Sequence, residues 1–152
     1  MSGSEFAATF DATTGADLGE IVAVGSSEVD VGQHIRAMVP GRRYVTVHTH
    51  PASTPPSSAD AEVLVANAAI RAVIVVGADG TWYALGREAG RPVTVETLRT
   101  MFFAALYVLR PRFIALGRAQ GLGRDQIVVA LLDAIWRTIA SRLRLRYDRW
   151  KS

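Results

Sequence analysis

From Phe6 to Gly90, short hydrophobic runs alternate with polar and glycine-rich turns. The runs Phe6–Phe10 and Gly19–Val24 flank a turn-rich cluster, which predicts a β-hairpin. The β-branched segment Tyr44–His50 predicts a further strand, and it runs directly into a proline-rich loop. This half of the chain therefore has the pattern of a sheet.

Two further patterns complete the first part of the chain. Ala72–Val76 and Thr81–Leu85 are hydrophobic runs joined through Asp79-Gly80, which predicts a second hairpin. Ala59–Ile70 has the composition and length of a three-turn helix, with Ser57 or Ser58 available as its N-cap, and Val31–Met38 has weaker helical character. Strands interspersed with short helices predict an α/β fold around a mixed sheet.

The character of the chain changes beyond Pro92. Val95–Leu109 and Arg124–Arg146 show helical periodicity, and Pro111 and the glycine-rich stretch 117–123 separate them. We therefore expect an α/β domain over residues 1–92 and an α-helical, arginine-rich C-terminal extension over residues 93–152.

The charge is distributed unevenly between these two parts. Residues 1–97 hold 6 Arg and 11 acidic residues, whereas residues 98–152 hold 10 Arg, 1 Lys and 3 acidic residues. The chain has no cysteine, so thiolate metal sites and disulfides are excluded. No hydrophobic stretch is long and uncharged enough to predict a membrane span, and the N-terminal residues lack a secretory pattern, which predicts a cytoplasmic protein.

Candidate chemistry is concentrated where the Tyr44–His50 strand meets the following helix. His48 and His50 are two residues apart on a strand, so both rings project from the same face. The loop Thr54-Pro55-Pro56 returns the chain, and Asp60 in the first turn of the helix can supply a third ligand. Two histidines and one carboxylate leave a fourth position open for water, which is typical of a catalytic zinc ion.

The segment His48-Thr-His50-Pro, a short loop, and then Ser57-Ser-Ala-Asp60 resembles the metal-binding signature of the JAB/MPN (JAMM) metallopeptidases. The resemblance covers residues 5–90. It implies an MPN/JAB-like, cytidine-deaminase-like fold with a mixed sheet flanked by helices, and Zn²⁺ held by His48, His50 and Asp60. It also implies hydrolysis of an amide or isopeptide bond, with the C-terminal tail of a ubiquitin-like protein as a candidate substrate.

The resemblance further implies two catalytic residues. In the family a glutamate upstream of the histidines, next to a strand, acts as general acid and base through zinc-bound water, and Glu5 matches that place. Glu20, at the next predicted strand, is the alternative. The family's oxyanion-binding serine corresponds to Ser57, or to Ser58 because the loop after His50 is one residue shorter than usual.

Other interpretations stay open at this stage. A catalytically silent MPN-like scaffold or binding module would share the fold, and the arginine-rich extension could bind nucleic acid, a protein partner or a second copy of the chain. His34 has no neighbouring ligand at metal-binding spacing, which favours a packing or surface role. The aromatic and aliphatic cluster Phe102, Phe103, Leu106, Tyr107 and Leu109 predicts a buried helix face.

Overall fold

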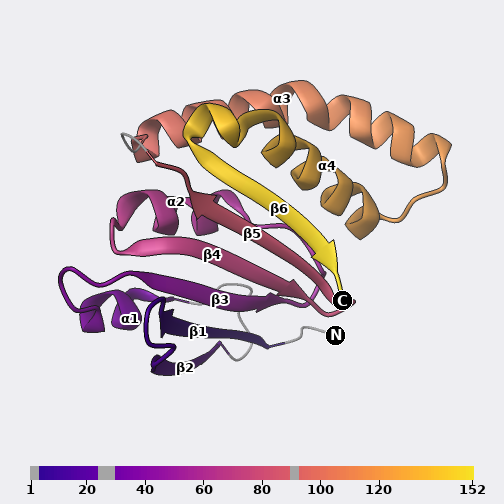
Figure 1. Ribbon diagram of the computed structural model, residues 1–152. Helices are drawn as coiled ribbons and strands as arrows, with labels where there is room; N and C mark the ends of the chain where they lie inside the picture. Colours follow the sequence, from indigo (N-terminus) through magenta and orange to yellow (C-terminus); the bar gives the residue numbers. More distant parts are fainter. Residues whose placement is uncertain (1–3, 24–29, 90–92) are drawn as a thin grey trace.

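The computed structural model describes residues 4–23, 30–89 and 93–152. In these residues, six strands form one mixed sheet in the order β2-β1-β3-β4-β5-β6 (Figure 1). β3 and β4 are parallel, and all other neighbours are antiparallel. The strands are β1 Glu5–Asp11, β2 Asp17–Ala23, β3 Tyr44–His50, β4 Ile70–Gly77, β5 Thr81–Arg87 and β6 Leu145–Lys151.

Four α-helices accompany the sheet in the described part of the chain: α1 Gly32–Ala37, α2 Ser58–Ala66, α3 Val95–Ala119 and α4 Arg124–Ile139, followed by a 3₁₀ turn at Ser141–Leu143. α3 and α4 pack against each other, and α3 forms the outer edge of the molecule in Figure 1. The α/β fold with a mixed sheet and a C-terminal helical pair is therefore confirmed. Both hairpins predicted from the sequence are also present, although Val24, the end of one predicted run, lies outside the described residues.

The helices pack against one face of the sheet. Alternate residues of the strands supply Val73, Val75, Tyr83 and Leu85 to a core that α2, α3 and α4 complete. α1 reaches the same face, because His34 bonds the buried side chain of Thr9 on β1. The opposite face carries the exposed residues Phe6, Val22 and Trp150.

The α2 helix is shorter than predicted. We expected a helix over Ala59–Ile70, but α2 ends at Ala66, and Ile70 already begins β4. The reason lies in β5, where the Arg87 guanidinium donates hydrogen bonds to the carbonyls of Leu64 and Val65. These carbonyls are among those that a helix end leaves without partners, so Arg87 caps the helix there.

The α3 helix is longer than predicted. Pro111 was expected to end it near Leu109, but the helix continues to Ala119. A proline in a helix removes one hydrogen bond, to the carbonyl four residues earlier, here that of Tyr107. Both Pro111 and Tyr107 are exposed, so water can satisfy that carbonyl and the helix can continue.

The C-terminal end corrects a third expectation. The helix predicted over Arg124–Arg146 ends at Ile139, and Leu145–Lys151 is the edge strand β6, paired with β5. Leu145 is buried in the core, and the next residue, Arg146, is exposed, as expected when successive side chains of a strand point to opposite faces. Several arginines of this region are in ion pairs: Arg137 and Arg149 with Asp133, and Arg146 with Asp148.

Candidate metal centre

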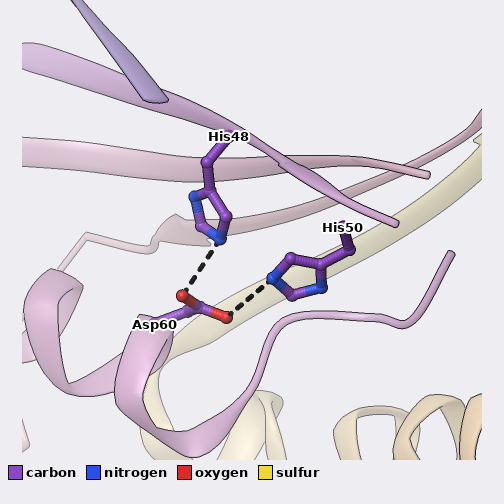
Figure 2. A group of neighbouring side chains, drawn as sticks. All are labelled: His48, His50 and Asp60. Carbon is purple, nitrogen blue, oxygen red and sulfur yellow. Dashed lines mark ion pairs between the residues drawn. The ribbon is translucent and has the colours of Figure 1, made fainter. Parts of the chain in front are cut away.

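The fold brings His48, His50 and Asp60 together. β3 delivers both histidines to its buried face at its carboxyl end, and the parallel β3–α2–β4 connection places the first turn of α2 beside them (Figure 2). The candidate ligand atoms of the three residues all lie within 4.8 Å of one another. The cluster predicted from the sequence thus exists, and it could hold a metal ion.

The two imidazoles face the two oxygens of one carboxylate. His48 Nε2 lies 3.0 Å from Asp60 Oδ1, and His50 Nε2 lies 3.6 Å from Asp60 Oδ2 (Figure 2). The two rings are tilted, with centroids 4.9 Å apart. A ligand set of two imidazoles and one carboxylate, at these mutual distances, is suited to a divalent transition metal.

The tautomer of His50 follows from its hydrogen bonds. Its Nδ1 lies 2.9 Å from the Thr54 carbonyl and 2.9 Å from the Thr54 hydroxyl. A carbonyl only accepts, so Nδ1 carries the proton and the Nε2 lone pair faces Asp60. Burial lowers the pKa of His50, which favours this neutral form although the charge of Asp60 opposes the shift. Metal-binding histidines are commonly oriented in this way, through the ring nitrogen that does not bind the ion.

The ring nitrogen of His48 that faces Asp60 lacks a hydrogen bond. Despite its 3.0 Å approach to Asp60, the His48 Nε2 has no hydrogen bond of acceptable geometry, and it is the one buried side-chain polar atom in this state among the described residues. A buried polar atom without a partner is costly. A cation between His48, His50 and Asp60 would remove this cost, so the residues present fit a metal ion.

Asp60 is held in its ionised form by its surroundings. Burial acts to raise the pKa of this carboxyl, but the adjacent His48 and His50 and a hydrogen bond from Ser57 outweigh it and lower the pKa to about 2. The Ser57 backbone N–H and hydroxyl donate to Asp60 Oδ2 at 2.6 and 2.8 Å, and the Asp60 N–H donates back to the Ser57 hydroxyl at 3.2 Å. Ser57 is therefore the N-cap of α2, and its capping box orients the candidate ligand.

The two glutamates considered from the sequence differ in position. On β1, Ala7 pairs with His48, and Glu5 lies two residues earlier with only 7% of its surface exposed. Residues two apart on a strand share a face, so Glu5 projects from the same face as the histidines. Glu20 pairs with Ala8 and is exposed on the opposite face, so the alternative assignment to Glu20 was wrong.

His34 lies apart from this cluster. It is buried in α1, and its Nδ1 bonds the Thr9 hydroxyl at 2.9 Å. Burial is also the main cause that lowers its pKa. The packing role expected for His34 is confirmed.

Three further groups fix the loop between β3 and α2, and the sequence did not identify them. Tyr83 donates its hydroxyl proton to the Ser53 carbonyl at 3.0 Å, and the Asp79 backbone N–H donates to the Ser53 hydroxyl at 3.0 Å. Trp136 of α4 donates its indole N–H to the Pro56 carbonyl at 2.7 Å. Partners that are distant in sequence give no local signal, although Thr54 could have been suspected from its place beside the histidines.

Comparisons of the chain with protein-family models, with curated proteins and with solved structures found no match.

Proposed function

We propose that this protein is a zinc-dependent hydrolase of amide or isopeptide bonds, of the JAMM type. The observation that carries the proposal is the convergence of two imidazole nitrogens on one ionised carboxylate at the end of β3. This ligand set, together with the His48-Thr-His50-Pro and Ser57-Ser-Ala-Asp60 sequence, is what such a site requires.

His48, His50 and Asp60 would hold the ion and leave part of its coordination sphere open. When bound, zinc supplies a Lewis acid that polarises a carbonyl and makes water acidic enough to lose a proton near neutral pH. Other divalent metals of similar preference could occupy the same ligands, and metal analysis distinguishes them.

Glu5 would act as the general base and acid of the reaction. It is buried on the strand next to β3, on the same face as the histidines and at the end of β1 that lies beside them. Asp11, the other buried acidic residue of β1, pairs with Tyr44 at the opposite end of β3. A carboxylate there can take a proton from the attacking water and pass it to the leaving amine. Ser57 would bind the oxyanion by turning its hydroxyl proton away from Asp60 Oδ2, which its backbone N–H would continue to orient.

The first experiment measures metal content by elemental analysis in the wild type, His50→Ala, Glu5→Gln and His34→Gln. His34→Gln is the matched control, because it changes a buried histidine outside the cluster. We expect one zinc per chain in every protein except His50→Ala, whose loss of an imidazole ligand removes the site.

The second measurement is hydrolysis of peptide and isopeptide substrates, including one with a ubiquitin-like C-terminal tail linked to lysine. Turnover in the wild type and His34→Gln, with none in Glu5→Gln, supports the proposal. Zinc without turnover in the wild type contradicts a hydrolase and favours a catalytically silent MPN-like scaffold. The absence of any bound metal contradicts the metal site and with it the hydrolase.

A further inference from the structure

The outer face of α3 is hydrophobic. Phe103, Tyr107 and Val108 are 54%, 83% and 55% exposed, respectively. At about 100° per residue, the smaller residues Ala104, Pro111 and Ala115 fill the space between Phe103, Tyr107 and Val108 on the helix surface. The sequence had predicted that Phe103 and Tyr107 are buried with Phe102, and this was wrong for both. The buried side of α3 consists instead of Leu98, Phe102 and Gly117.

The exposed side of α3 is unusual for a helix of a globular domain. The sequence contains no uncharged stretch long enough to cross a membrane, but by overall length and composition α3 is the one helix in the described residues that could do so. Only 11% of its hydrophobic 18-residue stretch is buried inside the protein. A hydrophobic core helix would be mostly buried. α3 cannot leave the domain without exposing Leu98 and Phe102 to water. Its outer face can therefore contact a partner only while α3 stays packed on the domain.

Arginines border this hydrophobic face. Relative to Tyr107, Arg110 lies about 60° to one side and Arg112 about 140° to the other, and Arg118 follows near the C-terminal end. Residues 103–118 contain these three arginines and no acidic residue. The nearby Glu62 is neutralised by Arg99, at 2.7 and 2.8 Å, and Glu96 lies in the first turn, about 16 Å along the helix from Tyr107.

We propose that the α3 face formed by Phe103, Tyr107, Val108, Arg110 and Arg112 binds the surface of an anionic lipid membrane. α3 would lie in the membrane plane, with its aromatic and aliphatic side chains at the boundary of headgroups and acyl chains. The arginines on both borders would contact the anionic headgroups. This pairing of opposite charges would favour an anionic membrane, which the hydrophobic side chains alone would not do.

The charge pattern disfavours a second copy of the chain on this face. Two such faces packed together would bring Arg110 and Arg112 of each copy into one interface, and no acidic side chain between residues 103 and 118 could pair with them. A membrane offers many anionic groups at adjustable positions. The proposal is independent of the metal centre, because α3 contributes no ligand to it.

The test is co-sedimentation of the full chain with vesicles of phosphatidylcholine containing about a quarter phosphatidylserine, and with vesicles of phosphatidylcholine alone. We expect binding to the anionic vesicles that weakens as salt is added. Arg110→Gln and Arg112→Gln should each reduce the partition coefficient about five-fold. Tyr107→Ser should also reduce the partition coefficient, because serine is small and polar and loses most of the hydrophobic contact that the tyrosine ring makes.

Val39→Ser is the matched control, since Val39 is 50% exposed but lies before β3 and far along the chain from α3. It should bind vesicles as the wild type does, and all variants should keep their metal content and thermal unfolding. Failure of the wild type to bind anionic vesicles, or equal binding by Tyr107→Ser, would overturn the proposal. Dimerisation without vesicle binding, abolished by Tyr107→Ser, would overturn it in favour of a second copy.

Discussion

The indole N–H of Trp136 donates a buried 2.7 Å hydrogen bond to the carbonyl of Pro56, across a separation of 80 residues. Pro56 precedes Ser57, the residue that caps α2 and orients Asp60. Trp136 is completely buried and its ring contacts Phe102 of α3. The C-terminal helical pair therefore fixes the loop that presents the candidate metal ligand.

Trp136→Phe should weaken metal binding. The substitution keeps an aromatic ring in the core but leaves the buried Pro56 carbonyl without its donor, which costs about 1–3 kcal/mol of stability. Because the loop then loses an anchor, we expect zinc affinity to fall by about tenfold, a loss typical of groups that orient metal ligands. The affinity is measured by competition with a chromophoric chelator.

Ile135→Val serves as the control for Trp136→Phe. Ile135 is also completely buried in α4, and the change costs about 0.5–1.5 kcal/mol without removing a hydrogen bond to the loop. It should lower stability and leave zinc affinity unchanged. Equal zinc affinity in Trp136→Phe and the wild type would show that the Trp136 bond has no positioning role.

Ser57 and Ser58 can be distinguished by paired alanine substitutions. Ser57→Ala removes the N-cap, which costs about 1 kcal/mol, and it removes a hydrogen bond to Asp60, so both stability and zinc affinity should fall. Ser58 lies one residue further on, already inside α2, and Ser58→Ala should change neither property appreciably. Calorimetry and metal titration check the two quantities, and an effect of Ser58→Ala as large as that of Ser57→Ala would contradict this assignment.

The ligand cluster could be predicted because its information is local. His48 and His50 share a face by strand alternation, and Asp60 follows within one loop and one helical turn, so the spacing alone brings all three together. Glu5 is a different case. The sequence suggested it by resemblance, and its place beside the histidines depends on the pairing of β1 with β3.

The errors arose where distant contacts decide the structure. Arg87, which caps the end of α2, comes from the distant strand β5. Leu145–Lys151 pairs with β5 as an edge strand, although its arginines would suit the end of a helix equally well. Phe103 and Tyr107 show the limit of periodicity. A hydrophobic helix pattern does not reveal which of its sides the rest of the chain covers, and here α4 covers only one.

Asp11 makes stability depend on pH. Hydrogen bonds from the backbone N–H groups of Thr13 and Thr14, and then from Arg42, lower its pKa from 3.8 to about 2. A lowered pKa means that the folded protein favours the ionised carboxylate, so the contribution is complete above about pH 4 and is lost as the pH falls toward 2. Asp11→Asn should thus be less stable than the wild type near neutral pH.

Denaturant titrations of Asp11→Asn and the wild type across the acid range, in the presence of chelator, measure this effect. The difference between the two proteins should shrink as the pH falls through this window. Arg42→Gln should show a smaller loss near neutral pH, because the bonds from Thr13 and Thr14 remain. A constant difference between Asp11→Asn and the wild type at all pH values would contradict the assignment.

Gly77 leaves room for the loop that carries the site. It pairs with His50 across β3 and β4, and a Cβ added to it would lie 2.8 Å from the Ser53 Cβ and 2.9 Å from the Ser53 Cα. Ser53 would have to shift, and with it the bonds from Tyr83 and Asp79. Gly77→Ala should therefore cost about 1–3 kcal/mol, as overpacking does, and weaken zinc binding.

Gly86→Ala is the matched control for Gly77→Ala, because Gly86 also lies in a central part of the sheet but a Cβ there meets nothing within 4 Å. Replacement of a strand glycine without a clash should be neutral or stabilise by about 0.5–1 kcal/mol. Thermal unfolding with and without zinc separates the two effects. If Gly77→Ala and Gly86→Ala behaved alike in both measurements, the close contact between Gly77 and Ser53 would not constrain the metal loop.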